Sequence, residues 1–158
     1  MPRLMHLFYL RQMYIRNNLV KPGAITLAGV PIDLTKVTVP VYLQASREDH
    51  IAPFRSVFKA KHNYSGPVRF VLAGSGHIAG VINPPEANKY QYWLNPEEPQ
   101  EVDAWLAGAT EYPGSWWPDW NAWLAAQSGD DVPARVPGDG KLAVIEDAPG
   151  SFVRQRTN

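Results

Sequence analysis

The sequence predicts an α/β fold in which parallel strands alternate with helices. Two short apolar runs rich in β-branched residues, 39–45 and 68–73, are typical of buried strands. Between them, residues 53–63 carry apolar side chains at helical spacing, and Pro53 suits the first turn of a helix. The order strand, helix, strand is that of a parallel unit, whose strands end at the same edge of a sheet.

The other predicted elements are short, because 15 prolines are spread along the chain. We expect a helix over 3–18, two short strands over 25–28 and 30–34 joined at Gly29, and helices over 98–109 and 118–126. Acidic residues in its first turn favour the helix at 98–109 through the helix dipole. No regular element is assigned to the polar stretch between Pro85 and this helix.

Composition excludes several classes of function. The 158 residues suit one domain, and 45% of them are hydrophobic, which is enough for a packed core. Fifteen basic and fifteen acidic residues leave no net charge, which argues against nucleic acid or an anionic membrane as a partner. No apolar run is long enough for a transmembrane segment, and the N-terminus lacks the features of a secretory signal. The absence of cysteine excludes disulfides and thiolate metal sites and fits a cytoplasmic location.

Two side chains that can carry chemistry follow the two predicted strands. Asp49 lies four residues beyond the first strand, and His77 follows the second strand after a Gly-Ser-Gly turn. The α/β-hydrolase fold supplies its catalytic triad in the order nucleophile, acid, histidine. In that interpretation Asp49 holds the imidazole in one tautomer and His77 is the general base. The alternatives are that Asp49 is a surface-turn or helix-capping residue and that His77 is structural.

No residue of the chain is a convincing nucleophile. Ser75 lacks glycines two places away on either side and follows the acid instead of preceding it, and Ser46 fits even less well. His50, together with Asp49 and His77, could ligate zinc, but no ligand-spacing motif supports a metal site. We therefore expect neither a metal nor a nucleophile from this segment.

Four of the six tryptophans lie within residues 116–123. Tryptophan side chains usually seal a core or an interface because they bury a large apolar surface. We expect this cluster to pack in the core or against another subunit. A surface that contacts a polymer or ligand is the alternative.

Longer motifs around the two candidate residues carry a family resemblance. Residues 40–53 resemble the acid loop of class I polyhydroxyalkanoate synthases, and residues 74–85 resemble the histidine loop of the same family. The segments 8–11 with 29–34, 114–120 and 148–153 are also similar to that family, so the resemblance covers the whole chain.

The resemblance implies an acyltransferase with an α/β-hydrolase core. The family polymerises (R)-3-hydroxyacyl-CoA into polyester with release of CoA, using a Cys-His-Asp triad. His77 would deprotonate the cysteine, while Asp49 would orient His77 or help to activate the 3-hydroxyl of the incoming unit. A thiolate is the competent nucleophile. The 3-hydroxyacyl-CoA is a substrate, and no cofactor is implied.

The chain departs from the family pattern in what it lacks. The elbow cysteine, the strands before it and most of the cap region are absent, and Met1 falls inside what resembles a continuous family segment. We therefore expect residues 1–158 to be a C-terminal fragment of the catalytic domain that is inactive alone. Residues 1–20 would end the cap region, 128–140 would form a flexible loop and 141–158 a C-terminal tail.

The resemblance also suggests partners and competing functions. The full-length parent would be a homodimer in the cytoplasm, at the surface of polyhydroxyalkanoate granules, in contact with the growing polyester and granule-associated proteins. The alternative function is a non-catalytic interaction module that binds a full-length synthase or the granule. A small hydrolase with another nucleophile is a third hypothesis.

Overall fold

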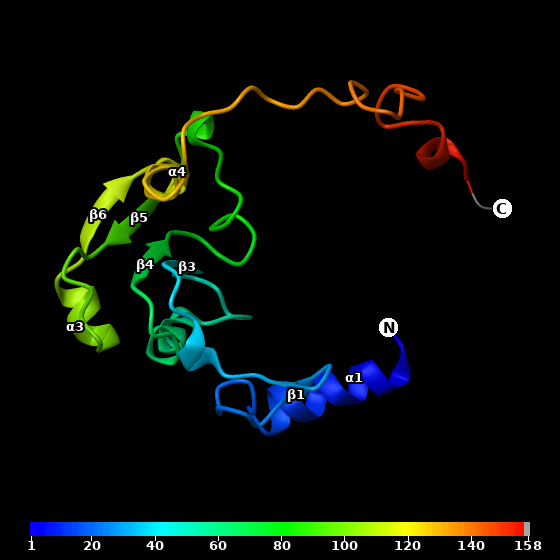
Figure 1. Cartoon of the computed structure of the whole chain (residues 1–158). Helices are drawn as coiled ribbons and strands as arrows, with labels where there is room; N and C mark the ends of the chain where they lie inside the picture. The colour runs from blue at the N-terminus through cyan, green and yellow to red at the C-terminus, as the bar shows by residue number, and fades with distance from the viewer. Residues whose placement is uncertain (157–158) are drawn as a thin grey trace. The chain divides into compact units, whose positions relative to one another are not determined.

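The computed structural model describes residues 1–156 and divides the chain into two units, 1–126 and 127 onward (Figure 1). The first unit contains a four-stranded sheet, a two-stranded hairpin and the helices that flank them. Its elements in chain order are α1 (Arg3–Tyr9), the π-helix η1 (Leu10–Ile15), β1 (Thr26–Leu27), β2 (Val30–Pro31), the 3-10 helix η2 (Leu34–Lys36), β3 (Val41–Ser46), α2 (Phe54–Phe58), the 3-10 helix η3 (Lys59–Asn63), β4 (Val68–Ala73), the 3-10 helix η4 (Pro85–Ala87), β5 (Gln91–Leu94), α3 (Val102–Ala107), β6 (Thr110–Pro113) and α4 (Trp117–Ala125).

The main sheet has the order β3-β4-β5-β6 and is mixed. β3 and β4 pair in parallel, from Val41 opposite Val68 to Ser46 opposite Ala73, which confirms the parallel pair predicted from the two apolar runs. β5 and β6 pair antiparallel, and the sequence did not predict either of them. Every residue of β6 is exposed, so it lacks the apolar alternation that reveals a strand. The fold is therefore α/β, with a mixed sheet in place of the purely parallel one expected.

Three of the four predicted helices are shorter than expected, whereas the one predicted over 118–126 has its expected length as α4. The helix expected over 53–63 is divided into α2 and the 3-10 helix η3, and the N-terminal helix changes to a π-helix at Leu10 and ends by Ile15. α3 begins at Val102, four residues after the predicted start. Pro99 explains why Glu98 is not helical, because a proline disfavours helical backbone in the residue before it, and Glu98 has φ 43°.

One face of the sheet carries the hydrophobic core. Phe58 of α2, Phe70 of β4 and Trp105 of α3 are fully buried and pack edge to face. Ring centroids lie 4.9 Å apart for Phe58 and Phe70 and for Phe70 and Trp105. Each such pair contributes about 0.5–1.5 kcal/mol beyond the burial of its area. The core thereby holds α2 and α3 against this face of the sheet.

The opposite face of the sheet binds α4. Tyr42 of β3 and Arg69 of β4 are neighbours in the parallel register and point to this face. The carboxylate of Asp119 in α4 accepts a hydrogen bond from the Tyr42 hydroxyl at 2.8 Å and one from Arg69 Nε at 3.1 Å. Arg69 Nη2 also donates to Asp119 Oδ1. Two neighbouring strands are thus joined to one helix through a single carboxylate.

The predicted pair of short strands around Gly29 is confirmed as an antiparallel hairpin, with Leu27 opposite Val30. In the second unit the only regular element among the described residues is the 3-10 helix η5 (Phe152–Arg154). Among the helices of residues 1–156, none has the length and apolar character needed to cross a membrane.

Candidate active site

Asp49 lies in the loop after β3, and three hydrogen bonds fix its carboxylate. Oδ1 accepts from the backbone N–H of Ile51 at 2.8 Å and of Ala52 at 2.9 Å. Oδ2 lies 2.8 Å from Nδ1 of His77. The Ala52 N–H, together with the His77 side chain and the Ile51 N–H, lowers the pKa of Asp49 to about 2. The carboxylate is therefore ionised at neutral pH.

His77 reaches this carboxylate from the loop after β4. The loops after β3 and β4 are joined by the backbone N–H of Arg47, which donates to Ala73 at 2.8 Å, and by that of Glu48, which donates to Ser75 at 3.0 Å. Ser75 has φ 69°, and this left-handed residue turns the chain into His77. Although 28 residues separate Asp49 and His77, the parallel strands bring them together, as the sequence predicted.

The Asp49 contact determines which nitrogen of the neutral His77 ring carries hydrogen. An ionised carboxylate can only accept, so Nδ1 is the donor and Nε2 keeps a lone pair. The imidazole is about half exposed, with 48% of its side chain accessible, whereas Asp49 is 7% exposed. A buried acid that orients a partly exposed histidine can present a base to a reacting group.

A small cavity of about 190 Å³ adjoins the pair. Its lining combines the pair with polar and apolar side chains, namely Gln44, Ala45, Ser46, Asp49, Ala52, Val57, His77 and Val81. No sequence motif indicated Gln44 or Val57 as residues of the site. The alternation of β3 is the signal that could have found Gln44, because it places Gln44 on the same face as Ser46.

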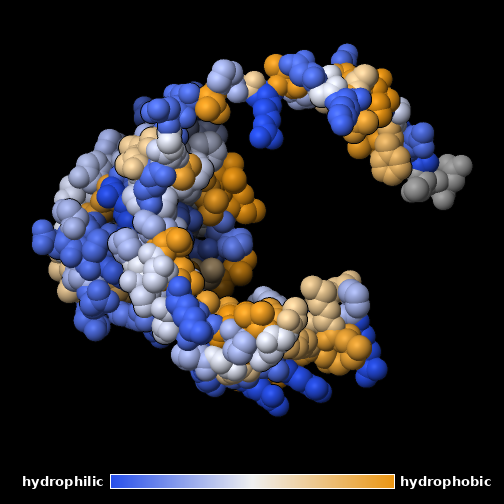
Figure 2. All heavy atoms as spheres, viewed as in Figure 1, coloured by the Kyte–Doolittle hydropathy of each residue, from blue (hydrophilic) through white to orange (hydrophobic). Residues whose placement is uncertain are grey.

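Exposed apolar side chains lie close to the pair in the sequence. Ile51 beside Asp49, and Ile78 and Ile82 in the loop after His77, are all more than 60% exposed. Figure 2 shows hydrophobic residues at the surface over the loop that follows β4. Such side chains are found where an apolar ligand or another polypeptide segment binds.

Among the described residues, the other sequence candidates form no hydrogen bond with the His77 ring, although Ser46 lines the same cavity. The Ser46 hydroxyl is buried and accepts a hydrogen bond from Gln44 Nε2 at 3.2 Å. His50 is exposed, and within residues 1–156 no hydrogen bond links it or Ser75 to the His77 ring. No group of three His, Cys, Asp or Glu side chains suited to a metal ion occurs in the described part of the chain.

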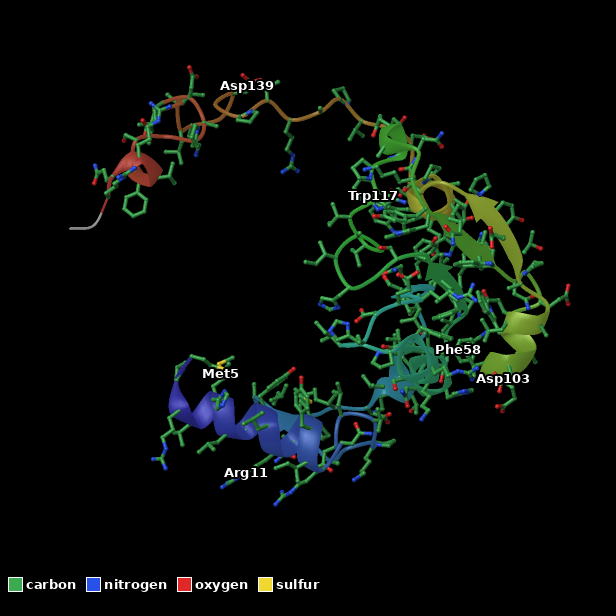
Figure 3. The ribbon with its side chains drawn as sticks, turned by 180° about the vertical axis from the view of Figure 1, so that it is seen from behind. Met5, Arg11, Phe58, Asp103, Trp117 and Asp139 are labelled. Carbon is green, nitrogen blue, oxygen red and sulfur yellow. The ribbon has the colours of Figure 1, made fainter. Side chains whose placement is uncertain are left out.

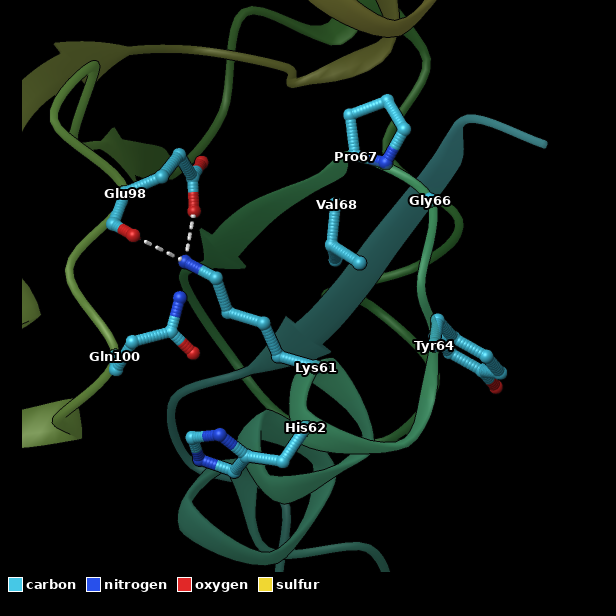
Figure 4. A pocket seen from close by; sticks show the side chains of 8 residues that line it. All are labelled: Lys61, His62, Tyr64, Gly66, Pro67, Val68, Glu98 and Gln100. Atoms are coloured by element: carbon cyan, nitrogen blue, oxygen red, sulfur yellow. Dashed lines mark hydrogen bonds and ion pairs between the residues drawn. The ribbon is translucent and has the colours of Figure 1, made fainter. Parts of the chain in front are cut away.

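A second cavity, of about 510 Å³, lies beside the N-terminal end of β4, and Figure 4 shows it at close range. Lys61 Nζ donates to the backbone oxygen and Oε2 of Glu98, both at 2.7 Å, and to the Pro99 oxygen at 3.1 Å. An ammonium group has three N–H donors, and all three are used. This lysine is thus a structural link between η3 and the segment before α3, with no donor left for a ligand.

These features define an α/β protein with a carboxylate–imidazole pair at the carboxyl edge of its parallel strands. The chain is 51% identical over 152 residues to a poly(3-hydroxyalkanoate) polymerase subunit PhaC of Rhizobium etli, covering 96% of this chain and 24% of that protein. Identity is 46% over 158 residues to the corresponding subunit of Cupriavidus necator, with 99% of this chain and 27% of that protein covered. A poly(3-hydroxyalkanoate) polymerase of Methylorubrum extorquens is 49% identical over 157 residues, which cover 99% of this chain and 26% of that protein.

Over nearly its whole length the chain is thus similar to part of the poly(3-hydroxyalkanoate) polymerases, which confirms the resemblance that its two loops predicted. It spans about a quarter of the length of the curated relatives it matches. No family model matches the chain.

Proposed function

We propose that this chain supplies the acid and the base of a polyester synthase. In this proposal the whole enzyme has an α/β-hydrolase core, polymerises (R)-3-hydroxyacyl-CoA and releases CoA. His77 is the general base and Asp49 its partner, and the nucleophilic thiol comes from residues outside the 158 of this sequence, which contain no cysteine. The hydrogen bond between Asp49 and His77 at the ends of two parallel strands is the observation that carries the proposal.

The order of the two residues supports an α/β-hydrolase core. In that fold the acid precedes the histidine, and both follow strands of the sheet. The relatives' names support the substrate, since each is called a poly(3-hydroxyalkanoate) polymerase. The exposed isoleucines around the pair agree with an apolar polyester as the product.

The proposed chemistry has two steps. His77 Nε2 accepts the thiol proton, the thiolate attacks the thioester carbonyl of the substrate, and the carbon–sulfur bond to CoA breaks as His77 returns the proton to the CoA sulfur. The 3-hydroxyl of another unit then attacks the acyl-enzyme. His77 accepts the hydroxyl proton and returns it to the enzyme thiolate as the ester forms.

The geometry favours an orienting role for Asp49 over direct contact with the 3-hydroxyl. Oδ1 already accepts two backbone N–H groups, and Oδ2 faces His77. The side chain is 7% exposed, so a substrate hydroxyl has little access to it. Asp49 then acts by fixing the tautomer of His77 and stabilising the imidazolium, and His77 takes the hydroxyl proton.

A chimeric enzyme tests this proposal. The chain would replace the matching quarter of the Cupriavidus necator polymerase, and CoA release from 3-hydroxybutyryl-CoA would be measured. We expect His77→Gln and Asp49→Asn each to lower the rate by about 10³-fold or more, the scale of triad substitutions. His50→Gln, a change at an exposed neighbour, is the control. An active chimera that tolerates His77→Gln would refute the proposal, and so would CoA release by the 158-residue chain alone.

We also propose that the whole enzyme is a homodimer that works at the surface of the polymer granule. The exposed apolar side chains beside the site support contact with polymer. Co-sedimentation of the chimera with polyester granules tests this location, and sedimentation equilibrium tests the dimer. A chimera that stays in solution with granules present would contradict the granule location. A chimera that sediments as a monomer would contradict the dimer.

A further inference from the structure

Two consecutive tryptophans bind two consecutive residues of the histidine loop. Trp116 Nε1 donates to the backbone oxygen of Gly80 at 2.9 Å, and Trp117 Nε1 donates to that of Val81 at 2.9 Å. Gly80 and Val81 follow His77 by three and four residues. Figure 3 labels Trp117 at the start of α4, beside this loop.

The tryptophans are themselves fixed on the sheet. The Trp116 ring stacks on Tyr42 of β3 with centroids 5.9 Å apart. Asp119, one turn along α4, is bound by Tyr42 and Arg69 as described above. Because these partners belong to β3 and β4, they fix the start of α4 on the two strands that lead to Asp49 and His77.

Both ends of the loop are attached, since the Glu48 N–H donates to the Ser75 oxygen at 3.0 Å and Asn83 Nδ2 donates to the Lys89 oxygen at 3.0 Å. Fewer bonds reach the middle of the loop, residues 78–82. Ile78 and Ile82 are exposed, so little apolar burial holds the loop against the protein. Its turn is closed by the N–H of Gly80, which donates to Gly76, and by that of Ile82, which donates to Ile78. Gln44 Nε2 also approaches the Gly80 oxygen, at 3.5 Å. The two indole N–H groups are therefore the main hydrogen bonds from another element to the carbonyls of residues 78–82.

We propose that Trp116 and Trp117 are positioning residues for His77. By binding Gly80 and Val81 they keep the loop closed, and the closed loop keeps the imidazole against Asp49. The inference rests on the proposed role of His77 as the base, but its structural half is measurable without any reaction. In this proposal each indole nitrogen acts as a hydrogen-bond donor to the loop, a role that packing of the aromatic ring alone would not need.

The first experiment uses the full 158-residue chain. Trp116→Phe and Trp117→Phe keep an aromatic ring and remove the N–H donor. Trp120→Phe is the matched control, because its ring packs edge to face on Trp116 in the same helix. Amide hydrogen exchange of residues 78–82 and the ¹⁵N shifts of the His77 ring are measured by NMR, and urea unfolding reports global stability.

We expect loop exchange to accelerate about three- to tenfold in each variant, the effect of losing one hydrogen bond. The share of His77 with hydrogen on Nδ1 should fall, and Trp120→Phe should change neither quantity. Unchanged loop exchange and ring shifts in both Trp116→Phe and Trp117→Phe would overturn the inference. If Trp116→Phe fails to fold, Trp117→Phe alone decides, because its hydrogen bond is exposed and its loss spares the stacking on Tyr42.

The second experiment uses the active chimera. There both substitutions should lower kcat with little change in KM, since a displaced base slows the chemistry without removing a substrate contact. Unchanged kcat in both variants would overturn the positioning role. Retention of activity by His77→Gln would instead refute the proposed function, and the loop exchange would still decide whether the tryptophans hold the loop.

Discussion

Gly80 lies so close to Ser46 that no side chain fits between them. A Cβ added to Gly80 would be 2.1 Å from the Ser46 hydroxyl oxygen and 2.8 Å from the Gly76 backbone oxygen. The histidine loop therefore packs directly on the end of β3, the strand that leads to Asp49.

The first prediction concerns this close packing. Gly80→Ala should lower the free energy of unfolding by about 1–3 kcal/mol, the usual range for overpacking, and should separate the loop from β3. Gly76→Ala is the control in the same loop, because its added Cβ would meet only Glu48, at 3.8 Å. Ser46→Gly should recover part of the loss in the double variant. Equal unfolding midpoints for the two alanine variants would contradict this account.

The second prediction concerns acid. The pKa of Asp49 is lowered to about 2 in the folded chain, from about 3.9 in an unfolded one. A carboxyl with a lowered folded pKa adds stability that is complete above the unfolded value and disappears as the pH falls toward the folded one. The difference in urea midpoint between the original chain and Asp49→Asn should therefore shrink between about pH 4 and pH 2. A difference that stays constant over this window would show that the ionised carboxylate is not responsible.

The third prediction concerns the buried ion pair of Lys61 and Glu98. Their side chains are 5% and 24% exposed, and Glu98 Oε1 also accepts the Phe70 N–H at 3.0 Å. Lys61→Met should cost about 2–4 kcal/mol, near the range for breaking a buried pair, because it leaves the carboxylate without its cation.

An exposed ion pair provides the matched control for that substitution. Arg55 and Asp103 are also 2.7 Å apart, but their side chains are 53% and 78% exposed. Asp103→Asn should therefore cost no more than about 1 kcal/mol. If urea unfolding gave equal losses for Lys61→Met and Asp103→Asn, burial would not be the source of the Lys61 contribution.

The fourth prediction concerns alkali. Burial, with the Asp119 carboxylate, raises the pKa of Tyr42 well above the ordinary tyrosine value. An acid whose folded pKa is raised gives stability that is complete below the unfolded pKa, about 10, and is lost as the pH rises beyond it. Thermal unfolding of the original chain and of Tyr42→Phe should thus converge above about pH 10. Tyr64→Phe is the control, and a gap that widens with pH would contradict the prediction.

The sequence predicted the part of the fold that local pattern determines. β4 coincides with its predicted range, because its apolar run is bounded by Pro67 and Gly74. The proximity of Asp49 and His77 followed from the rule that parallel strands end at one edge. Both inferences needed only contiguous residues and general topology.

The missed features depend on contacts between distant residues. Lys61 lies in the helix predicted over 53–63, and nothing in that pattern indicates that it is buried, because its partner Glu98 lies 37 positions away. β6 is an exposed edge strand that is defined by its pairing with β5, and its own residues carry no strand pattern. The indole bonds of Trp116 and Trp117 likewise join residues 36 positions apart, so the packing predicted for the tryptophan cluster gave no hint of donation.

The register of the parallel pair β3–β4 limits where related chains can be recombined. Each residue inserted in or deleted from either strand would shift one loop against the other by about 3.3 Å. This shift is larger than the 2.8 Å between His77 Nδ1 and Asp49 Oδ2, so the hydrogen bond would be lost. Such a shift would also turn the inward side chains outward. Recombination among the polymerases that this chain resembles should therefore tolerate crossover points before Val41 or after the histidine loop. Crossovers between them should succeed only when the spacings from Val41 to Asp49 and from Val68 to His77 are preserved residue for residue.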